Sequence, residues 1–170
     1  MNLSTRNIVV AGMLSAIAII LGSTGLGLIP VPTPAGAVTI MHIPAILGGI
    51  MEGPLVGLLI GLIFGIFSFM RAGSALFADP LIAILPRLFI GVLAYYTYLF
   101  LKNINKTTAY AVAGIVGTAV NTIGVLGLAM LRGYLPPAAA MSIALMHGIP
   151  EALAAAIIVT ILCRILLNRQ

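Results

Sequence analysis

Residues 54–70 read PLVGLLIGLIFGIFSFM, an apolar run without a charged side chain. Its glycines recur at every fourth position, Gly57, Gly61 and Gly65. This small-xxx-small spacing lets two membrane helices pack closely. No Lys-Ser or Lys-Thr pair follows the glycines, so they do not form a phosphate-binding loop. The run predicts a helix that packs inside a membrane bundle.

The same apolar character extends over the whole chain. Of its 170 residues, 62% are hydrophobic and 6% are charged, and the mean hydropathy is +1.25. Soluble domains are about half apolar and a quarter charged, and disordered segments combine low hydrophobicity with high net charge. Both classes are excluded, and an integral membrane protein remains. At roughly 20 residues for each crossing, a single membrane domain over residues 1–170 has no space for an ATPase module.

Apolar runs bounded by glycine, proline or charge predict an all-α integral membrane protein with six transmembrane helices in a compact bundle. The expected bounds are 7–28, 41–52, 54–70, 81–101, 108–131 and 143–167. The second run has about a dozen residues, which barely cross a bilayer. Five crossings with a re-entrant second segment are therefore the alternative. Six crossings are favoured because both ends of the chain then lie on one side, in agreement with the charges.

The basic residues indicate which side faces the cytoplasm. Eight Lys and Arg against three Asp and Glu give a net charge of +5. With the N-terminus inside, the basic residues on the cytoplasmic side are Arg6, Lys102, Lys106, Arg164 and Arg169. Arg71 and Arg132 fall outside, and Arg87 lies within the fourth run. Because cationic loops are retained in the cytoplasm, both termini are predicted to be cytoplasmic. The longer, outer connections are residues 29–40, 71–80 and 132–142, and a binding site is expected on that side.

Polar residues at membrane depth need an explanation, because an ionisable group there is costly and usually faces the bundle interior or a watery cavity. Those in the outer half are His42, preceded by Thr39, and Arg87, Asn121, His147 and Glu151. At ~1.5 Å for each helical residue, they converge on one depth from different helices. His147 and Glu151 are four residues apart and share one helix face. The pattern predicts a substrate-binding cavity that opens outward.

Each of these residues also has an ordinary explanation. The histidines could lie at the membrane interface, Glu151 could neutralise a helix N-terminus, Arg87 could extend to the outer surface and Asn121 could join two helices. Catalysis is not indicated, because the sequence has no Cys/His cluster and no HExxH motif. No third ligand accompanies His147 and Glu151, so neither metal nor cofactor is expected. The single cysteine, Cys163, is predicted to be a buried, inert thiol.

The first predicted helix carries small residues that would let another helix approach its backbone. They form the overlapping pairs Ala11/Ser15 and Gly12/Ala16. Packing inside the bundle and binding of an external partner are equally compatible with this composition.

Several further stretches, spread over nearly the whole chain, form a pattern together with this helix. They are Thr39–Pro44, Gly48–Pro54, Gly57–Phe64, Phe77–Pro80 with Leu85–Arg87, and His147–Glu151. Their order, the six-helix layout and the chain length resemble the substrate-binding S components of energy-coupling factor (ECF) transporters. The resemblance implies a non-enzymatic, multi-pass subunit in a prokaryotic cell membrane that captures a vitamin or its precursor from outside.

The resemblance also implies partners on other chains: a transmembrane coupling protein and two ABC ATPases, with no nucleic acid. In this family a small-residue motif on the first helix contacts the coupling protein. The matching positions are Ala11, Gly12, Ser15 and Ala16. The usual Ala-xxx-Ala is Ala-xxx-Ser here, which leaves the register open.

The charges of the expected site favour an acidic substrate. A buried arginine such as Arg87 binds carboxylate or phosphate through paired hydrogen bonds. The chain has no Trp and only 6% aromatic residues, so a stacking box for a flavin or pterin is less expected. Pantothenate is the first candidate, and lipoate, pyridoxine, hydroxymethylpyrimidine and riboflavin stay open. From other classes, a stand-alone carrier with a proton-linked His147–Glu151 pair and an accessory subunit without a ligand also stay open.

Overall fold

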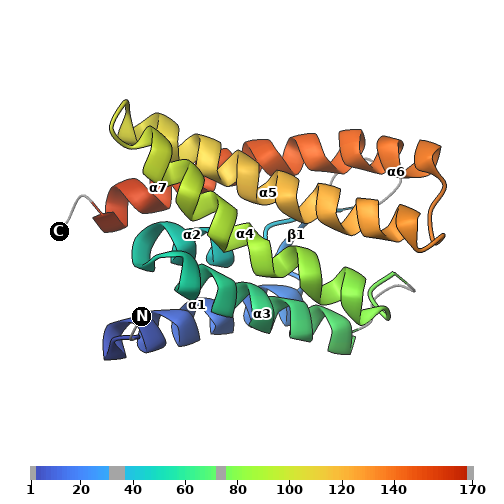
Figure 1. Cartoon of the computed structure of the whole chain (residues 1–170), viewed down its shortest axis with the longest axis horizontal. Coiled ribbons are helices and arrows are strands. Elements are labelled where there is room, and N and C mark those ends of the chain that lie inside the picture. The colour runs from blue at the N-terminus through green and yellow to red at the C-terminus, as the bar shows by residue number, and fades with distance from the viewer. Residues whose placement is uncertain (1–2, 31–36, 72–75, 168–170) are drawn as a thin grey trace.

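The computed structural model describes residues 3–30, 37–71 and 76–167 and is a bundle of helices (Figure 1). The elements are α1 (Thr5–Thr24), β1 (Leu28–Pro30), β2 (Ala37–Thr39), α2 (Ile43–Glu52), α3 (Pro54–Arg71), α4 (Pro80–Leu101), α5 (Lys106–Leu131), α6 (Pro137–Ile143), a π-helical turn η1 (Ala144–Gly148) and α7 (Ile149–Leu167). The last three form one continuous helix, Pro137–Leu167. β1 and β2 pair antiparallel.

Polar caps explain why three helices begin one or two residues before the predicted apolar runs. Ser4 caps α1, because its side-chain hydroxyl accepts a hydrogen bond from the backbone N–H of Asn7 at 3.2 Å. Asp79 caps α4 by accepting from Leu81 N at 2.9 Å, and Asn105 caps α5. Each cap satisfies a backbone N–H that has no partner within its helix.

Two predicted boundaries are wrong. The first helix ends at Thr24, not at residue 28, because Gly25 takes a left-handed conformation (φ 75°) that stops the helix. The last helix begins at Pro137, not at residue 143. A proline is favoured at the first helical position, and the alanines that follow it are good helix formers. The connection predicted at 132–142 is therefore only residues 132–136.

Five helices of the described chain are long and apolar enough to cross a membrane, and α2 is too short to cross one by itself. Six helices are therefore present, counting Pro137–Leu167 as one, but six full-length transmembrane helices are not. α2 has 10 residues and a length of about 15 Å, half that of α1. Its residues from Ile43 to Ile50 are all buried. The start of α2 therefore lies at about half the depth of the bundle.

Both ends of the chain lie at the same end of the bundle, together with the α4–α5 connection (Figure 1). The α3–α4 and α5–α6 connections lie at the opposite end. The placement of both termini on one side of the membrane stays a prediction. Their cytoplasmic orientation stays a prediction, and Arg169 lies outside the described residues. Large apolar side chains such as Ile8, Met13 and Ile157 are exposed while several ionisable groups are buried, as expected for a protein surrounded by lipid.

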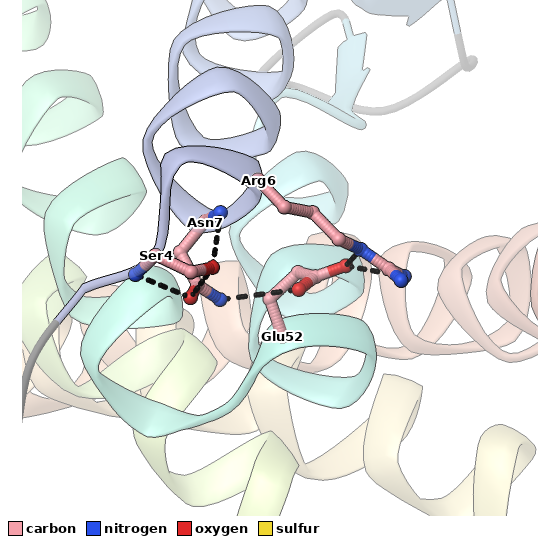
Figure 2. A network of polar contacts seen from close by, with 4 residues as sticks. All are labelled: Ser4, Arg6, Asn7 and Glu52. Atoms are coloured by element: carbon pink, nitrogen blue, oxygen red, sulfur yellow. Dashed lines mark hydrogen bonds and ion pairs between the residues drawn. The ribbon is translucent and has the colours of Figure 1, made fainter.

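A polar network joins α1 to the turn between α2 and α3 (Figure 2). Arg6 Nε donates to Glu52 Oε1 at 2.9 Å, and Asn7 Nδ2 donates to Glu52 Oε2 at 3.1 Å. The Glu52 side chain is largely buried, although it lies at the end of the bundle. The network sets the start of α1 and the end of α2 at one level. Because α2 has only 10 residues and ends at this level, it begins deep inside the bundle.

Glycines bring the backbones of α2, α3 and α4 into contact, as the small-xxx-small pattern predicts. A Cβ added at Gly91 would lie 2.5 Å from Gly57 Cα, and one added at Gly49 would lie 2.2 Å from Gly91 O. One turn before Gly91, a Cβ at Gly61 would lie 2.1 Å from the carbonyl oxygen of Arg87. These close approaches place Arg87 directly against α3.

Candidate functional site

His42 begins α2 inside the bundle, and it is completely buried (0% exposed). Its Nε2 lies 2.8 Å from Thr118 Oγ1 on α5, and that hydroxyl donates to Gly114 O at 2.9 Å. Its Nδ1 is buried without a hydrogen-bond partner among the described residues. His42 therefore lies among the packed helices and not on the surface of the bundle.

Arg87 lies one residue after Pro86 and is only 3% exposed, so it does not extend to the surface. Pro86 has no N–H, so the carbonyl of Ile82 has no donor within the helix. Arg87 Nη1 donates to this carbonyl at 3.2 Å and also to Ala83 O. Arg87 thus repairs a defect that its proline neighbour creates.

The Arg87 guanidinium is held between two aromatic rings. Its Cζ lies 4.9 Å from the ring centroid of Phe64 on α3 and 4.9 Å from that of Phe77, which precedes α4. Its Nε has no hydrogen-bond partner, and no carboxylate pairs with it in the described part of the chain. Ala45 on α2 and Gly91 on α4 lie one helical turn after His42 and Arg87, and a Cβ added at Gly91 would lie 2.5 Å from Ala45 O. The site therefore contains a buried cation with a free donor beside an imidazole with a free nitrogen.

Glu151 connects α7 to the strand that leads into His42. Its Oε1 accepts a hydrogen bond from Thr39 N at 2.8 Å, across 112 residues of sequence. The side chain is buried. Since α7 continues directly from η1, Glu151 does not lie at a free helix N-terminus, and the explanation that it neutralises one is wrong.

Asn121 and His147 are also buried. Asn121 lies three residues after Thr118 on α5, and its Oδ1 has no hydrogen-bond partner among the residues described. His147 lies in the π-helical turn η1. Pro150 follows and lacks the N–H that an α-helix needs at this point, which accounts for the local π geometry.

The structure thus joins Thr39 to Glu151 by a hydrogen bond, and it places His42 and Arg87 on helices that are in contact one turn further on. That the predicted residues face one pocket stays a prediction. Among the described residues no hydrogen bond joins Asn121 Oδ1 to either pair. The prediction missed Thr118, Phe64 and Phe77. Thr118 could have been found, because it lies one turn from Asn121 on the same helix face. The two phenylalanines carry no such signal, since any apolar residue suits their positions in sequence.

An apolar groove of about 320 Å³ lies between α5 and the η1–α7 segment. Exposed side chains such as Ile123 and Leu153 line it, and Thr122 and Gly148 lie within it. It contains none of the six predicted substrate residues. It faces outward from the bundle, so the candidate site is defined by the buried polar groups and not by this groove.

The end of the bundle opposite the two termini carries an ion pair between Arg132 Nε and Asp79 Oδ2 at 2.8 Å. This hydrogen bond and charge hold the pKa of Asp79 below its usual range. Nearby, Arg71 donates to the carbonyl of Gly22 at the end of α1. Arg71 and Asp79 are therefore structural contacts, and they do not belong to the substrate-binding set.

The small residues of α1 divide between two faces. Ala11 and Ser15 are buried inside the bundle, whereas Gly12 and Ala16 are exposed. An added Cβ at Gly12 would meet nothing within 4 Å. Of the predicted interface, only the Gly12/Ala16 pair is open to a partner. In the described ranges no three His, Cys, Asp or Glu could hold a metal ion together, and Cys163 is buried and free.

The bundle encloses, near mid-depth, an imidazole and an arginine that has no carboxylate partner in the described chain. It therefore belongs to the class of polytopic membrane proteins with an internal polar site. The model of the family described as "ECF transporter, substrate-specific component" matches residues 6–163. The chain belongs to this family. No curated protein matches the chain. A solved structure reported as "Structure and mechanism of the S component of a bacterial ECF transporter" is similar to this chain, with 23% sequence identity and a TM-score of 0.58. The match covers 96% of this chain and 94% of the chain in that structure. At this identity the likeness shows the fold.

Family membership makes the chain a substrate-specific, multi-pass membrane subunit of an ECF transporter. Such subunits are not enzymes. They bind a small molecule and associate with an ECF module, in which separate subunits hydrolyse ATP. This assignment is favoured over a stand-alone carrier and over an accessory subunit without a ligand.

Proposed function

We propose that this protein binds a small carboxylate-bearing vitamin or precursor in the outer half of the membrane of a prokaryotic cell and delivers it to an ECF module. Pantothenate is the first candidate. The observation that supports this proposal is Arg87, a buried guanidinium without a carboxylate partner in the described chain. Removing a charge from water costs several kcal/mol unless an opposite charge and hydrogen bonds compensate it. A substrate carboxylate supplies both through paired N–H···O contacts.

The neighbours of Arg87 fit the same role. Phe64 and Phe77 hold its planar group in one orientation, which reduces the entropy lost when an anion binds. His42 and Asn121 add buried hydrogen-bonding atoms from α2 and α5. Riboflavin, pyridoxine and hydroxymethylpyrimidine carry no anionic group, so they leave the guanidinium without a partner. A carboxylate is therefore favoured over them.

Identification of the co-purified ligand tests this proposal. The purified chain is denatured, and the small molecules that it releases are identified by mass spectrometry. A carboxylic acid in near-stoichiometric amount is expected from the unmodified protein and not from Arg87→Met. A neutral vitamin recovered in equal amount from both proteins would exclude the acidic substrate.

We propose further that the exposed Gly12/Ala16 face of α1 docks the coupling protein. Gly12→Leu would block close helix contact there, and a Cβ at this position meets nothing within 4 Å in the isolated chain. Gly127→Leu on α5 is a matched control, since a Cβ at Gly127 also meets nothing within 4 Å. Co-purification with the coupling protein and ATPases is expected to be lost in Gly12→Leu and retained in Gly127→Leu. Equal recovery of both would move the interface elsewhere.

The proposed orientation places both termini in the cytoplasm. Because Cys163 is buried, an introduced cysteine is the only reactive thiol expected. Ile104→Cys in the α4–α5 connection is expected to resist an impermeant thiol reagent added to intact cells, while Tyr134→Cys at the opposite end reacts. The reverse pattern would invert the topology. Both positions are exposed.

A further inference from the structure

Thr118 determines which nitrogen of His42 carries the proton. A hydroxyl has one proton to donate and can accept through its lone pairs. The 2.9 Å contact between Thr118 Oγ1 and Gly114 O joins two oxygens, so the hydroxyl proton must lie between them. Thr118 Oγ1 therefore accepts at its other contact, and His42 Nε2 is the donor at 2.8 Å.

The other ring nitrogen is then an acceptor. A second positive charge close to Arg87, inside the bundle and away from water, would be costly, so the neutral imidazole is the relevant form. With Nε2 protonated, Nδ1 of neutral His42 carries a lone pair. This atom is buried and has no donor among the described residues. It requires a hydrogen-bond donor, which a carboxylate cannot provide.

Arg87 has the opposite requirement. Its Nε–H is buried without an acceptor in the described chain, and a guanidinium only donates. The two neighbouring groups therefore need different partners: Arg87 needs an acceptor, and His42 Nδ1 needs a donor. Asn121 Oδ1, one turn from Thr118, is a second buried acceptor without a partner in this part of the chain. A single carboxylate satisfies only Arg87.

We propose, building on the function proposed above, that the site selects an anion that also carries a hydroxyl or amide N–H group. The acid group accepts from Arg87 Nε–H, and the hydroxyl or amide donates to His42 Nδ1. Thr118 is the positioning residue that keeps this nitrogen an acceptor. The substrate class is thus small hydroxylated or amide-bearing acids. Acids without a donor, such as lipoate, and donors without an acid, such as pyridoxine, are rejected.

Matched ligands test the two requirements separately. Pantothenate carries a carboxylate, an amide N–H and two hydroxyls. The dideoxy-pantothenate analogue has both hydroxyls replaced by hydrogen and its amide nitrogen methylated, so it keeps the acid but carries no donor. Panthenol replaces the acid by an alcohol. Calorimetry on the purified full chain in lipid nanodiscs is expected to show pantothenate binding, with each analogue weaker by about tenfold or more. Lipoate and pyridoxine are expected to bind no better than the analogues.

The outcomes separate this inference from the proposed function. Equal affinity for pantothenate and dideoxy-pantothenate, with weak panthenol binding, would keep the anion site and overturn the donor requirement. Tight lipoate binding would do the same. Panthenol binding as tight as pantothenate would overturn both. Absence of binding by every acid in the panel also overturns both.

A pair of variants tests Thr118. Thr118→Val removes the acceptor for His42 Nε2–H, whereas Thr118→Ser keeps the hydroxyl. The affinity ratio of pantothenate to dideoxy-pantothenate is expected to fall towards one in Thr118→Val and to be retained in Thr118→Ser. A purely structural role would weaken both ligands equally and leave the ratio unchanged, which would overturn the role of Thr118.

A spectroscopic measurement on the unmodified protein does not depend on how these variants fold. In the chain labelled with a heavy nitrogen isotope in histidine, NMR distinguishes a protonated from an unprotonated Nδ1, and His42→Gln assigns the signal. An unprotonated Nδ1 that shifts on pantothenate binding is expected. A protonated Nδ1 in the ligand-free protein would overturn the inference.

Discussion

Arg87→Met is expected to have opposite consequences for ligand binding and for the stability of the ligand-free protein. The guanidinium has two possible roles in the structure. It satisfies the Ile82 carbonyl, which Pro86 leaves without a helical donor, and it is proposed to bind the substrate carboxylate. Methionine retains much of the apolar volume between Phe64 and Phe77 but has no donor and no charge.

The magnitudes follow from these contacts. A buried carbonyl left without a donor costs about 1–3 kcal/mol. Removal of an unpaired buried charge relieves a desolvation penalty of several kcal/mol, as an order of magnitude. The ligand-free variant is therefore expected to be about as stable as the unmodified protein, or more stable. Loss of hydrogen bonds to a charged group, about 1.5–3 kcal/mol each, lowers the ligand affinity by roughly ten- to a hundredfold or more.

Pro86→Ala supplies the control that separates the two roles. Alanine restores a backbone N–H that can donate to Ile82 O. The double variant Pro86→Ala/Arg87→Met therefore has a complete set of helical backbone hydrogen bonds but no cation. Thermal unfolding in detergent is expected to show equal or higher stability for the double variant than for Arg87→Met. Calorimetry is expected to show no recovery of pantothenate affinity, while Pro86→Ala alone still binds.

Two results would refute this reasoning. Unchanged pantothenate affinity in Arg87→Met would remove Arg87 from the binding site. Affinity restored by adding Pro86→Ala would show that Arg87 serves the helix only, and that binding depends on the shape of α4 and not on the guanidinium.

Other contacts lead to further predictions. Gly91→Ala is expected to lower the free energy of unfolding by about 1–3 kcal/mol, because its Cβ would lie 2.5 Å from Gly57 Cα. Thermal unfolding measures this change, with Gly12→Ala as the control. Equal stability of the two variants would contradict the close packing. Since Arg132 lowers the pKa of Asp79, their pairing contributes stability at neutral pH that is lost as the pH falls below about 4. Asp79→Asn should therefore reduce the loss of stability on acidification, measured by unfolding at a series of pH values. An unchanged pH dependence would exclude this contribution of the ion pair. Glu52→Gln should speed amide hydrogen exchange at the start of α1, leaving exchange in α5 unchanged as the internal control.

The division of residues between interior and lipid was only partly predictable. Hydropathy predicts the long helices, because the bilayer requires each crossing segment to satisfy its own backbone and expose apolar side chains. It does not predict which face of α1 turns inward, so the Ala11/Ser15 and Gly12/Ala16 pairs could not be distinguished. Nor does it predict the caps at Ser4 and Asp79, which act through single hydrogen bonds.

The sequence alone determined that this is a helical membrane protein, which apolar runs build it, and that His42, Arg87 and Glu151 are too costly to face lipid. Those conclusions depend on local composition and on the energy of a charge in a bilayer. Only the tertiary structure decided their partners: Thr39 for Glu151, Thr118 for His42, and the pair Phe64 and Phe77 for Arg87. These contacts join residues far apart in the chain, and they exist because the short α2 and the glycine contacts among α2, α3 and α4 bring the helices to one depth and rotation.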